Sequence, residues 1–351
     1  MKILVTGGAG YIGSHTIMEL LTIPGIEVIS ADNFSNSTSE TFVRIKKITG
    51  KDVANYCVDL TDFNSTEKIF IENSGIDGII HFAALKAVGD SVEKPIHYYR
   101  NNIVSLLNLL RCTERFEVKH LIFSSSCTVY GNIAKLPVSE KTPLKKAESP
   151  YGHSKLFGEQ IIEDYCKTIP YFKAVVLRYF NPVGAHISGE IGELPLNRPN
   201  NLVPIITGVA AGLHKRFFVH GNDYTTRDGT CIRDYVHVSD IANAHVLALE
   251  YLSGKNESKN FEIFNLGTGK GVSVMEIIDA FEKNTKVKLN YRIGARRPGD
   301  VEAIYSDSSK AEKILGWKPK FGIDDMMKTA WRWQKKAVGK KAVGSRQEKK
   351  Q

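Results

Sequence analysis

Short apolar runs alternate with helical patterns over the first 180 residues of the chain. The predicted strands cover residues 2–6, 26–31, 53–58, 78–82, 120–124 and 172–177. Helical patterns separate them at residues 12–21, after Thr38, and near Phe63, Ile96 and Tyr151. This alternation predicts an α/β fold in which a doubly wound, Rossmann-like parallel sheet is covered by helices on both faces.

The alternation stops after Asn181, where a stretch rich in Gly, Pro and Asn runs to about Asn201. An apolar helix is predicted next, over residues 202–213, and a later helix (238–252) and strand (261–266) are expected to return to the main sheet. We therefore expect two discontinuous domains and a tail. A dinucleotide-binding domain would hold residues 1–181 and about 234–266, a smaller substrate-binding domain residues 182–233 and about 267–336, and a disordered basic tail residues 337–351.

Charge changes this picture only at the end of the chain. The net charge is +9 over 351 residues, but residues 335–351 contain seven basic residues and one acidic residue. This stretch repeats Lys-Lys-Ala-Val-Gly in tandem at 335–339 and 340–344 and has no apolar periodicity. We interpret it as a solvated extension and expect no nucleic-acid partner, with binding to nucleic acid or another anionic surface as the alternative.

The cysteines and the apolar runs restrict the compartment. Five scattered cysteines without a CxxC or CxxxH pair indicate neither a disulfide framework nor a zinc site. No apolar run reaches the length of a membrane span, and a strand that begins at residue 2 predicts that no cleavable presequence precedes it. We expect a cytoplasmic protein without a membrane partner.

Three glycines follow the first predicted strand, at Gly7, Gly10 and Gly13. Glycine there lets a phosphate approach backbone N–H groups at a helix N-terminus, although any tight turn can use glycine. Asp32 ends the second strand, nineteen residues after Gly13. A carboxylate at that place accepts both ribose hydroxyls of an adenosine and repels a 2′-phosphate, which favours NAD over NADP, although a turn aspartate is the simpler interpretation of Asp32 alone.

Tyr151 and Lys155 are four residues apart on a helix that follows Ser149 and Pro150, so their side chains share one face. An ammonium close to a phenol favours the tyrosinate, which can act as a base. In isolation such a pair is an ordinary helix-surface pair, and Ser124 to Ser126 is an ordinary polar turn. Because these groups and the glycine turn all lie at strand ends, where open α/β sheets bind ligands, we interpret them as one site.

Together, these motifs resemble the extended short-chain dehydrogenase/reductases, and within them the UDP-glucose 4-epimerase family. The matching stretches run in order up to about Gln334, at residues 5–15, 32–33, 81–89, 123–131, 149–155, 177–186, 199–202, 221–224, 228–230 and 233–237. The resemblance implies a reversible interconversion of UDP-glucose and UDP-galactose, as in galactose metabolism. Tyr151 would take the proton of the C4 hydroxyl while hydride passes to tightly bound NAD, Ser126 would share the proton, and Lys155 would lower the tyrosine pKa. The 4-keto sugar would then rotate and take the hydride back on its other face.

The resemblance also implies the ligand contacts. Cofactor contacts would come from Gly7, Gly10, Tyr11, Ile12, Gly13, Asp32, Asn33, Asp59, Leu60, Phe82, Ala83, Lys86, Ser124, Tyr151, Lys155 and Tyr179. Contacts to the UDP-hexose would come from Lys86, Ser126, Thr128, Tyr151, Phe180, Asn181, Asn201, Leu202, Arg233, Arg297, Asp300 and Ile304. A homodimer would form through helices near residues 96–115 and 151–167.

Three positions depart from the family pattern. Ile304 stands where a tyrosine is associated with rejection of UDP-N-acetyl sugars and a cysteine or serine with their acceptance, so additional activity on UDP-GlcNAc and UDP-GalNAc stays open. His220 replaces an expected phenylalanine, and Leu194 replaces an acid.

Two other interpretations are kept. A related NAD-dependent enzyme, a 4,6-dehydratase or a decarboxylase, would carry a carboxylate just after the serines, where this chain has Cys127 and Thr128. A non-catalytic NAD-sensing protein would use the basic tail to bind a partner.

Overall fold

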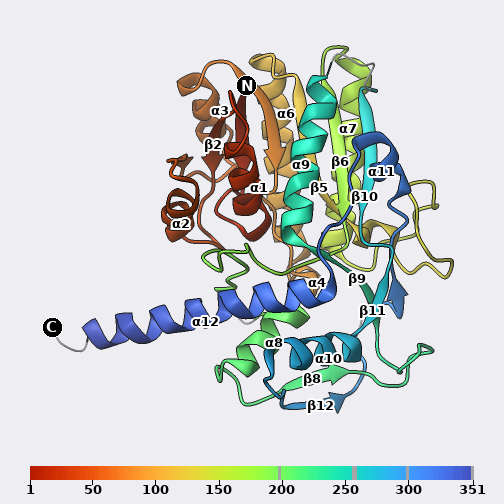
Figure 1. Cartoon of the computed structure of the whole chain (residues 1–351). Helices are drawn as coiled ribbons and strands as arrows, with labels where there is room; N and C mark the ends of the chain where they lie inside the picture. Colours follow the sequence, from red (N-terminus) through yellow and green to blue (C-terminus); the bar gives the residue numbers. More distant parts are fainter. Residues whose placement is uncertain (197–198, 255–258, 298–299, 349–351) are drawn as a thin grey trace.

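The main sheet is parallel and has seven strands in the residues that this computed structural model describes (Figure 1). Those residues are 1–196, 199–254, 259–297 and 300–348, with the backbone alone described for 339–348. The strands are β1 (Lys2–Thr6), β2 (Glu27–Ala31), β3 (Ala54–Tyr56), β4 (Ile76–His81), β5 (His120–Ser126), β6 (Lys173–Tyr179) and β10 (Phe261–Leu266). Their order is β10-β6-β5-β4-β1-β2-β3, so the winding direction reverses beside β1. The predicted doubly wound fold is confirmed.

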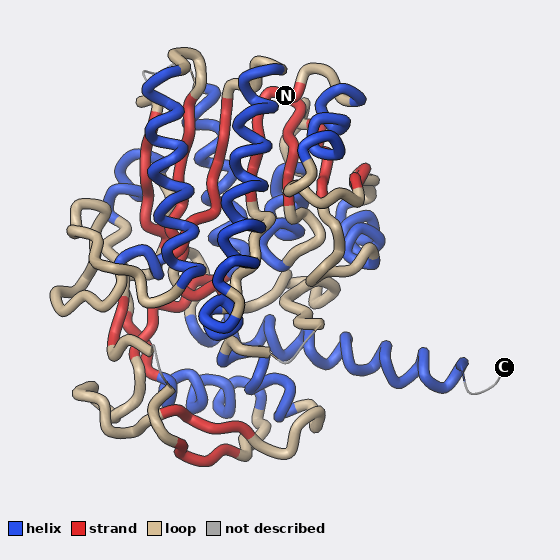
Figure 2. Tube along the Cα trace, turned by 180° about the vertical axis from the view of Figure 1, so that it is seen from behind, coloured by secondary structure: helices blue, strands red, loops and turns tan. Residues whose placement is uncertain are grey.

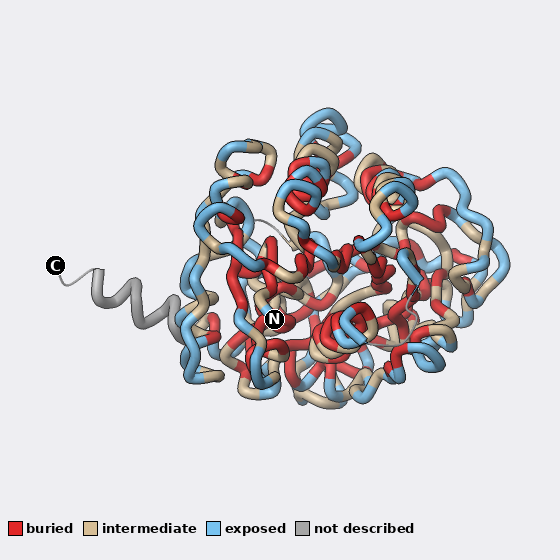
Figure 3. The backbone as a smooth tube through the Cα atoms, turned by 90° about the horizontal axis from the view of Figure 1, so that it is seen from above, coloured by how far each residue is buried: buried red, intermediate tan, exposed pale blue. Residues whose placement is uncertain are grey.

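Helices cover both faces of this sheet (Figures 1 and 2). In β1, Ile3 and Val5 pack into one apolar core and Leu4 into the other, as the two-residue period of a strand requires. The first core includes side chains of α1 (Tyr11–Leu21), α2 (Glu40–Thr49), α9 (Val238–Ser253) and α11 (Ser309–Leu315). The second includes side chains of α3 (Phe63–Glu72), α6 (Ser105–Arg115) and α7 (Pro150–Thr168). Figure 3 shows the buried residues gathered between these layers.

Between β4 and α6 the chain forms several short helices where the sequence predicted one near Ile96. They are α4 (Val88–Glu93), α5 (Pro95–Tyr99) and a π-helical turn, Arg100–Val104, that leads directly into α6. A single 3₁₀ turn, Cys127–Tyr130, follows β5. Both irregular segments adjoin the carboxyl end of the main sheet.

A smaller part of the molecule lies beyond the carboxyl ends of the main strands (Figure 1). One small sheet is formed by β7 (Asn181–Val183), β9 (Ile232–His237), β11 (Gly271–Ser273) and β13 (Ala303–Ile304), and a second by β8 (Phe217–His220) and β12 (Tyr291–Gly294). Helices α8 (Leu202–Ala210), α10 (Val274–Thr285) and the start of α12 (Ile323–Glu348) share its core. Three of these strands, β7, β11 and β13, have only two or three residues, too few to show a period in the sequence.

The last helix corrects one expectation. Residues 337–348 continue α12, which extends away from the body in Figure 1, where the sequence predicted a disordered tail; residues 349–351 lie outside the described residues. Extending a helix that is already packed is far easier than starting one, and Lys, Ala, Gln and Arg favour it. None of the helices in the described part of the chain combines the length and apolar character needed to cross a membrane.

Candidate active site

The turn from β1 into α1 requires glycine at Gly7 and Gly13. Gly7 has φ +71°, and a Cβ added there would lie 2.8 Å from the backbone nitrogen of Ala83. A Cβ on Gly13 would lie 2.3 Å from the carbonyl oxygen of Gly7. Gly10 closes the turn by donating its N–H to the same oxygen at 3.0 Å, and α1 begins at the next residue. The turn can therefore present backbone at a helix N-terminus to an anionic ligand.

Asp32 lies directly over this turn at the end of β2. Its buried carboxylate accepts hydrogen bonds from the N–H of Ala9 at 3.0 Å, the N–H of Phe34 at 2.9 Å and the hydroxyl of Ser37 at 2.8 Å. The next residue, Asn33, is exposed. The Asp32 carboxylate therefore stabilises the local turn by accepting hydrogen bonds, and it also lies beside the glycines, at the edge of the predicted cofactor site.

The other predicted cofactor contacts on this side follow β3 and β4. Asp59 is exposed, whereas Leu60 is buried and its carbonyl accepts the side-chain amide of Asn108 at 2.9 Å. Phe82 and Ala83 continue beyond β4 beside the glycine turn, where the N–H of Phe82 donates to the carbonyl of Thr6 at 3.0 Å. These residues line the same sheet edge as Asp32.

Strand β5 brings hydroxyl groups to the middle of that edge. The Ser126 hydroxyl accepts the N–H of Thr128 at 3.3 Å and so caps the 3₁₀ turn. The Thr128 hydroxyl oxygen is buried and has no hydrogen-bond partner among the described residues. Tyr179, at the end of β6, pairs its hydroxyl with His245 Nε2 at 2.6 Å. Because a buried hydroxyl is costly to leave unpaired, Thr128 stands out as a group available to a ligand.

Helix α7 places Tyr151 and Lys155 against these hydroxyls. Ser149 caps the helix by accepting the N–H of Gly152 at 3.2 Å, and Pro150 occupies the first turn, as the sequence predicted. Lys155 is buried, and its ammonium donates to the Ser124 carbonyl at 2.7 Å and lies 6.0 Å from the centre of the Tyr151 ring. Serine, tyrosine and lysine thus meet at one point of the sheet edge.

Burial is the main influence on the acidity of this pair. Burial raises the pKa of Tyr151 to about 12, while a hydrogen bond from Ser126 acts in the opposite direction. Burial also lowers the pKa of Lys155 to about 7, partly countered by Glu159. Burial thus outweighs the Ser126 hydrogen bond, and the lowering of the Tyr151 pKa by Lys155 stays a prediction.

A buried ion pair that the sequence analysis did not single out lies beneath Lys155. Glu159, one helical turn further along α7, binds Arg178 of β6 with two hydrogen bonds of 3.0 and 2.6 Å and also accepts the Ser125 hydroxyl. Arg178 in turn donates to the Tyr130 hydroxyl at 3.0 Å. The network ties β5, β6, α7 and the 3₁₀ turn together, so it holds the tyrosine and lysine rigidly.

The predicted sugar contacts come from both parts of the molecule. Phe180 is buried just after β6, and Asn181 begins β7. Asn201 is exposed and immediately precedes Leu202, the first residue of α8. Lys86, which follows β4, is half exposed and pairs with Glu193 at 3.2 Å. The sequence analysis named Lys86 and Asn201 but assigned nothing to Glu193.

Two arginines and an aspartate gather beside β9 and β13. Arg297 binds Asp300 with two hydrogen bonds of 3.2 and 2.7 Å, and Arg233 lies 3.7 Å from the same carboxylate. Because Asp300 balances only part of this positive charge, the cluster favours a diphosphate. Ile304 pairs with Arg233 in the β13–β9 register and is 5% exposed, in a core cluster that also contains Phe180.

Two departures from the family pattern have plain structural settings. His220 is exposed on β8 and pairs Nδ1 with the carbonyl of Ala295 at 3.3 Å. Leu194 packs on a small apolar cluster of Ala185, Trp333 and Ala337. An acid in place of Leu194 would face this apolar surface, which explains why leucine suits this chain.

Comparison with known proteins decides the family. A family model described as GDP-mannose 4,6 dehydratase matches residues 4–330. The UDP-glucose 4-epimerase of Bacillus subtilis is 48% identical over 338 residues, which are 96% of this chain and 98% of the relative. The chain belongs to the UDP-glucose 4-epimerase family. Among the three interpretations of the sequence, epimerase membership is thus confirmed.

Solved structures of the epimerase family agree with this result. The UDP-glucose 4-epimerase of Bifidobacterium longum, solved with NAD⁺ and UDP, is 49% identical with a TM-score of 0.91 and covers 96% of this chain and 98% of its own. The UDP-Glc/GlcNAc 4-epimerase of Campylobacter jejuni is 37% identical with a TM-score of 0.81 and covers 95% of this chain and 99% of its own. The epimerase fold therefore extends over nearly the whole chain.

Proposed function

We propose that the protein interconverts UDP-glucose and UDP-galactose by inverting the sugar at C4 through a transient oxidation. The observation that carries the proposal is the meeting of Ser126, Tyr151 and Lys155 at the carboxyl edge of the main sheet, next to the glycine turn. Membership of the epimerase family supports it, as does the absence of a carboxylate at Cys127 and Thr128, where a dehydratase or decarboxylase would need one.

The residues at the glycine turn fit NAD. A Cβ would fill the space at Gly7 and Gly13, and the carboxylate of Asp32 beside them favours ribose hydroxyls over a 2′-phosphate. When bound, NAD supplies a hydride acceptor and a positive charge. The proposed contacts are Gly7, Gly10, Tyr11, Ile12, Gly13, Asp32, Asn33, Asp59, Leu60, Phe82, Ala83, Lys86, Ser124, Tyr151, Lys155 and Tyr179, in a dinucleotide-binding domain of residues 1–181 and about 234–266.

Tyr151 is the proposed base, and the proton moves directly between its phenol oxygen and the sugar hydroxyl. The phenolate oxygen takes the proton of the sugar C4 hydroxyl, with Ser126 hydrogen-bonded to both, and returns it when the opposite face is reduced. Because the pKa of Tyr151 is raised to about 12, mainly by burial and despite the Ser126 hydrogen bond, a positive charge is needed in the site to make the phenolate available near neutral pH. Lys155, held by the Ser124 carbonyl, orients the pair.

The proposed UDP-sugar contacts surround this tyrosine. Lys86, Ser126, Thr128, Phe180 and Asn181 would contact the hexose, and Asn201, Leu202, Arg233, Arg297 and Asp300 the diphosphate and uridine. The partly balanced charge of the arginine cluster supports the diphosphate assignment. The proposed diphosphate and uridine contacts belong to a proposed substrate-binding domain of residues 182–233 and about 267–336, whereas the proposed hexose contacts belong to the dinucleotide-binding domain.

Ile304 determines the proposed breadth of the substrate range. It is buried beside the register position of Arg233, and a branched aliphatic side chain leaves more room than a tyrosine. We propose additional activity on UDP-GlcNAc and UDP-GalNAc. A bifunctional relative, the UDP-Glc/GlcNAc enzyme of C. jejuni, has a similar fold.

We further propose a homodimer in the cytoplasm. Apolar side chains are exposed on neighbouring helices at Val92 (60%) and Ile96 (81%), and Phe157 of α7 is 47% exposed. These helices contact one another, and apolar side chains exposed on neighbouring helices favour a protein partner, which a second copy would supply symmetrically. The five cysteines are free thiols, which suits a reducing compartment.

The test is turnover of UDP-galactose, and separately of UDP-N-acetylgalactosamine, by purified protein without added NAD. We expect both substrates to be converted, and Ile304→Tyr to lose the second conversion by about tenfold or more while keeping the first. Turnover of UDP-galactose alone would restrict the proposal to the unsubstituted hexose. Turnover of neither substrate, even with NAD added, would overturn the epimerase proposal.

A further inference from the structure

Glu193 joins the two parts of the proposed substrate site. One of its carboxylate oxygens, Oε1, accepts the ammonium of Lys86 at 3.2 Å and the side-chain amide of Asn201 at 3.1 Å. Lys86 follows β4 of the main sheet, whereas Asn201 precedes α8 of the smaller part. The carboxylate is largely buried, with 14% of the side chain exposed, although Lys86 is 51% exposed.

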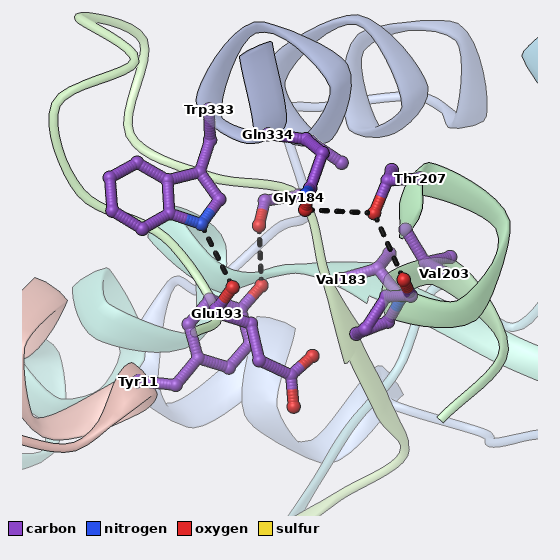
Figure 4. A pocket seen from close by; sticks show the side chains of 10 residues that line it. Tyr11, Val183, Gly184, Glu193, Val203, Thr207, Trp333 and Gln334 are labelled. Atoms are coloured by element: carbon purple, nitrogen blue, oxygen red, sulfur yellow. Dashed lines mark hydrogen bonds between the residues drawn. The ribbon is translucent and has the colours of Figure 1, made fainter. Parts of the chain in front are cut away.

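Rigid elements hold the backbone of Glu193. Trp333 of α12 donates its indole N–H to the Glu193 carbonyl at 2.8 Å, and the carboxylate points away from that indole (Figure 4). On one side Gly192 forms a bridge with Ala185, and a Cβ on it would lie 2.6 Å from the Trp333 ring. On the other side Leu194 packs on the cluster around Trp333.

The carboxylate of Glu193 binds two side chains that are both proposed contacts of the UDP-sugar. The two donors that it holds are long or flexible side chains, and fixing them before the substrate arrives reduces the entropy lost on binding. An ammonium has three N–H donors and an amide has two. Lys86 and Asn201 can each retain the hydrogen bond to Glu193 and still donate another N–H to a ligand.

We propose that Glu193 is a positioning residue that sets the distance between Lys86 and Asn201 and thereby the fit of the UDP-hexose. The inference rests on the proposed epimerase function and adds a role to a residue outside the proposed ligand contacts. Because Lys86 and Asn201 donate to the same oxygen of Glu193, movement of the carboxylate would shift both side chains together.

The test compares Glu193→Ala and Glu193→Gln with Glu190→Gln. Glu190 is the matched control, since it is a carboxylate of the same loop that pairs with Lys47 and Lys336 instead. We expect KM for UDP-galactose to rise about tenfold in Glu193→Ala and about threefold in Glu193→Gln, with kcat within about twofold of wild type. Glu190→Gln should leave KM unchanged, and all three variants should keep their bound NAD.

Repeating the substitution in a variant that lacks both partners of Glu193 distinguishes a positioning role from a nonspecific structural effect. In a Lys86→Met, Asn201→Ala protein, removal of the Glu193 carboxylate should raise KM no further, because its targets are gone. An unchanged or lower KM in Glu193→Gln would overturn the inference, as would an equal effect of Glu190→Gln; Glu193→Gln carries the test if the alanine variant does not fold. Failure of the wild-type protein to convert UDP-galactose would instead count against the proposed function.

Discussion

The proton-transfer region and the sugar-binding region are built differently. Tyr151 and Lys155 lie on one long helix packed against the main sheet, and a buried network of Glu159 and Arg178 supports them. Apart from Ser126 and Tyr151, the proposed UDP-sugar contacts lie on short strands, in loops or at a helix start, and their charges are held in ion pairs, such as Arg297 with Asp300 and Lys86 with Glu193. The first region is rigid before any ligand arrives, whereas ion pairs in the second can be rearranged by one.

This difference separates the chemistry from the choice of substrate. Proton transfer depends on sub-ångström placement, which a packed helix and sheet provide. Recognition of a diphosphate depends on charge and on hydrogen bonds that form at the moment of binding. Substitutions in the first region should therefore act on kcat, and those in the second on KM.

The largest expected effect is that of Tyr151→Phe, which removes the phenol hydroxyl, the proposed base, together with its hydrogen bond to Ser126. We expect kcat to fall about a thousandfold or more, because general base catalysis contributes about 10² to 10⁴ in rate. Turnover of UDP-galactose measures it, with Tyr171→Phe, an exposed tyrosine near the end of α7, as control. Activity of Tyr151→Phe within tenfold of wild type would contradict the proposal that the region around Tyr151 and Lys155 carries out the proton transfer.

Lys155→Met should lower kcat by about a hundredfold and also change the pH dependence of stability. Burial lowers the pKa of Lys155 from 10.5 to about 7, so between these values the unfolded chain holds a proton that the folded chain lacks. The free energy of unfolding should therefore rise with pH across this interval in the wild type. Urea unfolding between pH 7 and about 9.5 should give a flatter profile for the variant, and parallel profiles would contradict this placement of the lysine.

Arg297→Ala should raise KM about tenfold to a hundredfold and leave kcat within about threefold, since charge-assisted hydrogen bonds to a phosphate are lost. The neighbouring Arg296→Ala is the control, because Arg296 pairs with Asp223 and lies over the Tyr224 ring. Initial rates over a range of UDP-galactose concentrations separate the two constants. A fall in kcat without a rise in KM would contradict the separation of proton transfer in the first region from substrate binding in the second.

The smallest effect is expected from removal of residues 339–351. Ala337 is the last residue of α12 known to pack in an apolar cluster, among those whose side chains the structure describes. The truncated protein should keep kcat, KM and its unfolding temperature within measurement error. A loss of turnover would mean that the helical extension contributes to activity and is not merely a solvated end of α12.

Much of the main domain could be predicted from the sequence because its signals are local. The strands β1 to β6, the cap at Ser149 and the glycine turn each follow from short patterns in neighbouring residues. Resemblance to a family added the ligand contacts. In the small sheets, β7, β11 and β13 were missed because they have two or three residues each, too few to show a period.

By itself, then, the sequence determined the doubly wound fold, the family and the pair Tyr151 and Lys155, since these depend on spacing along one chain segment. Only the tertiary structure decided the protonation preferences of that pair, because burial depends on every element packed around it. It also brought Glu193 between Lys86 and Asn201, residues separated by more than a hundred positions. Contacts between distant segments carry no local pattern, and they exist only once the chain has folded.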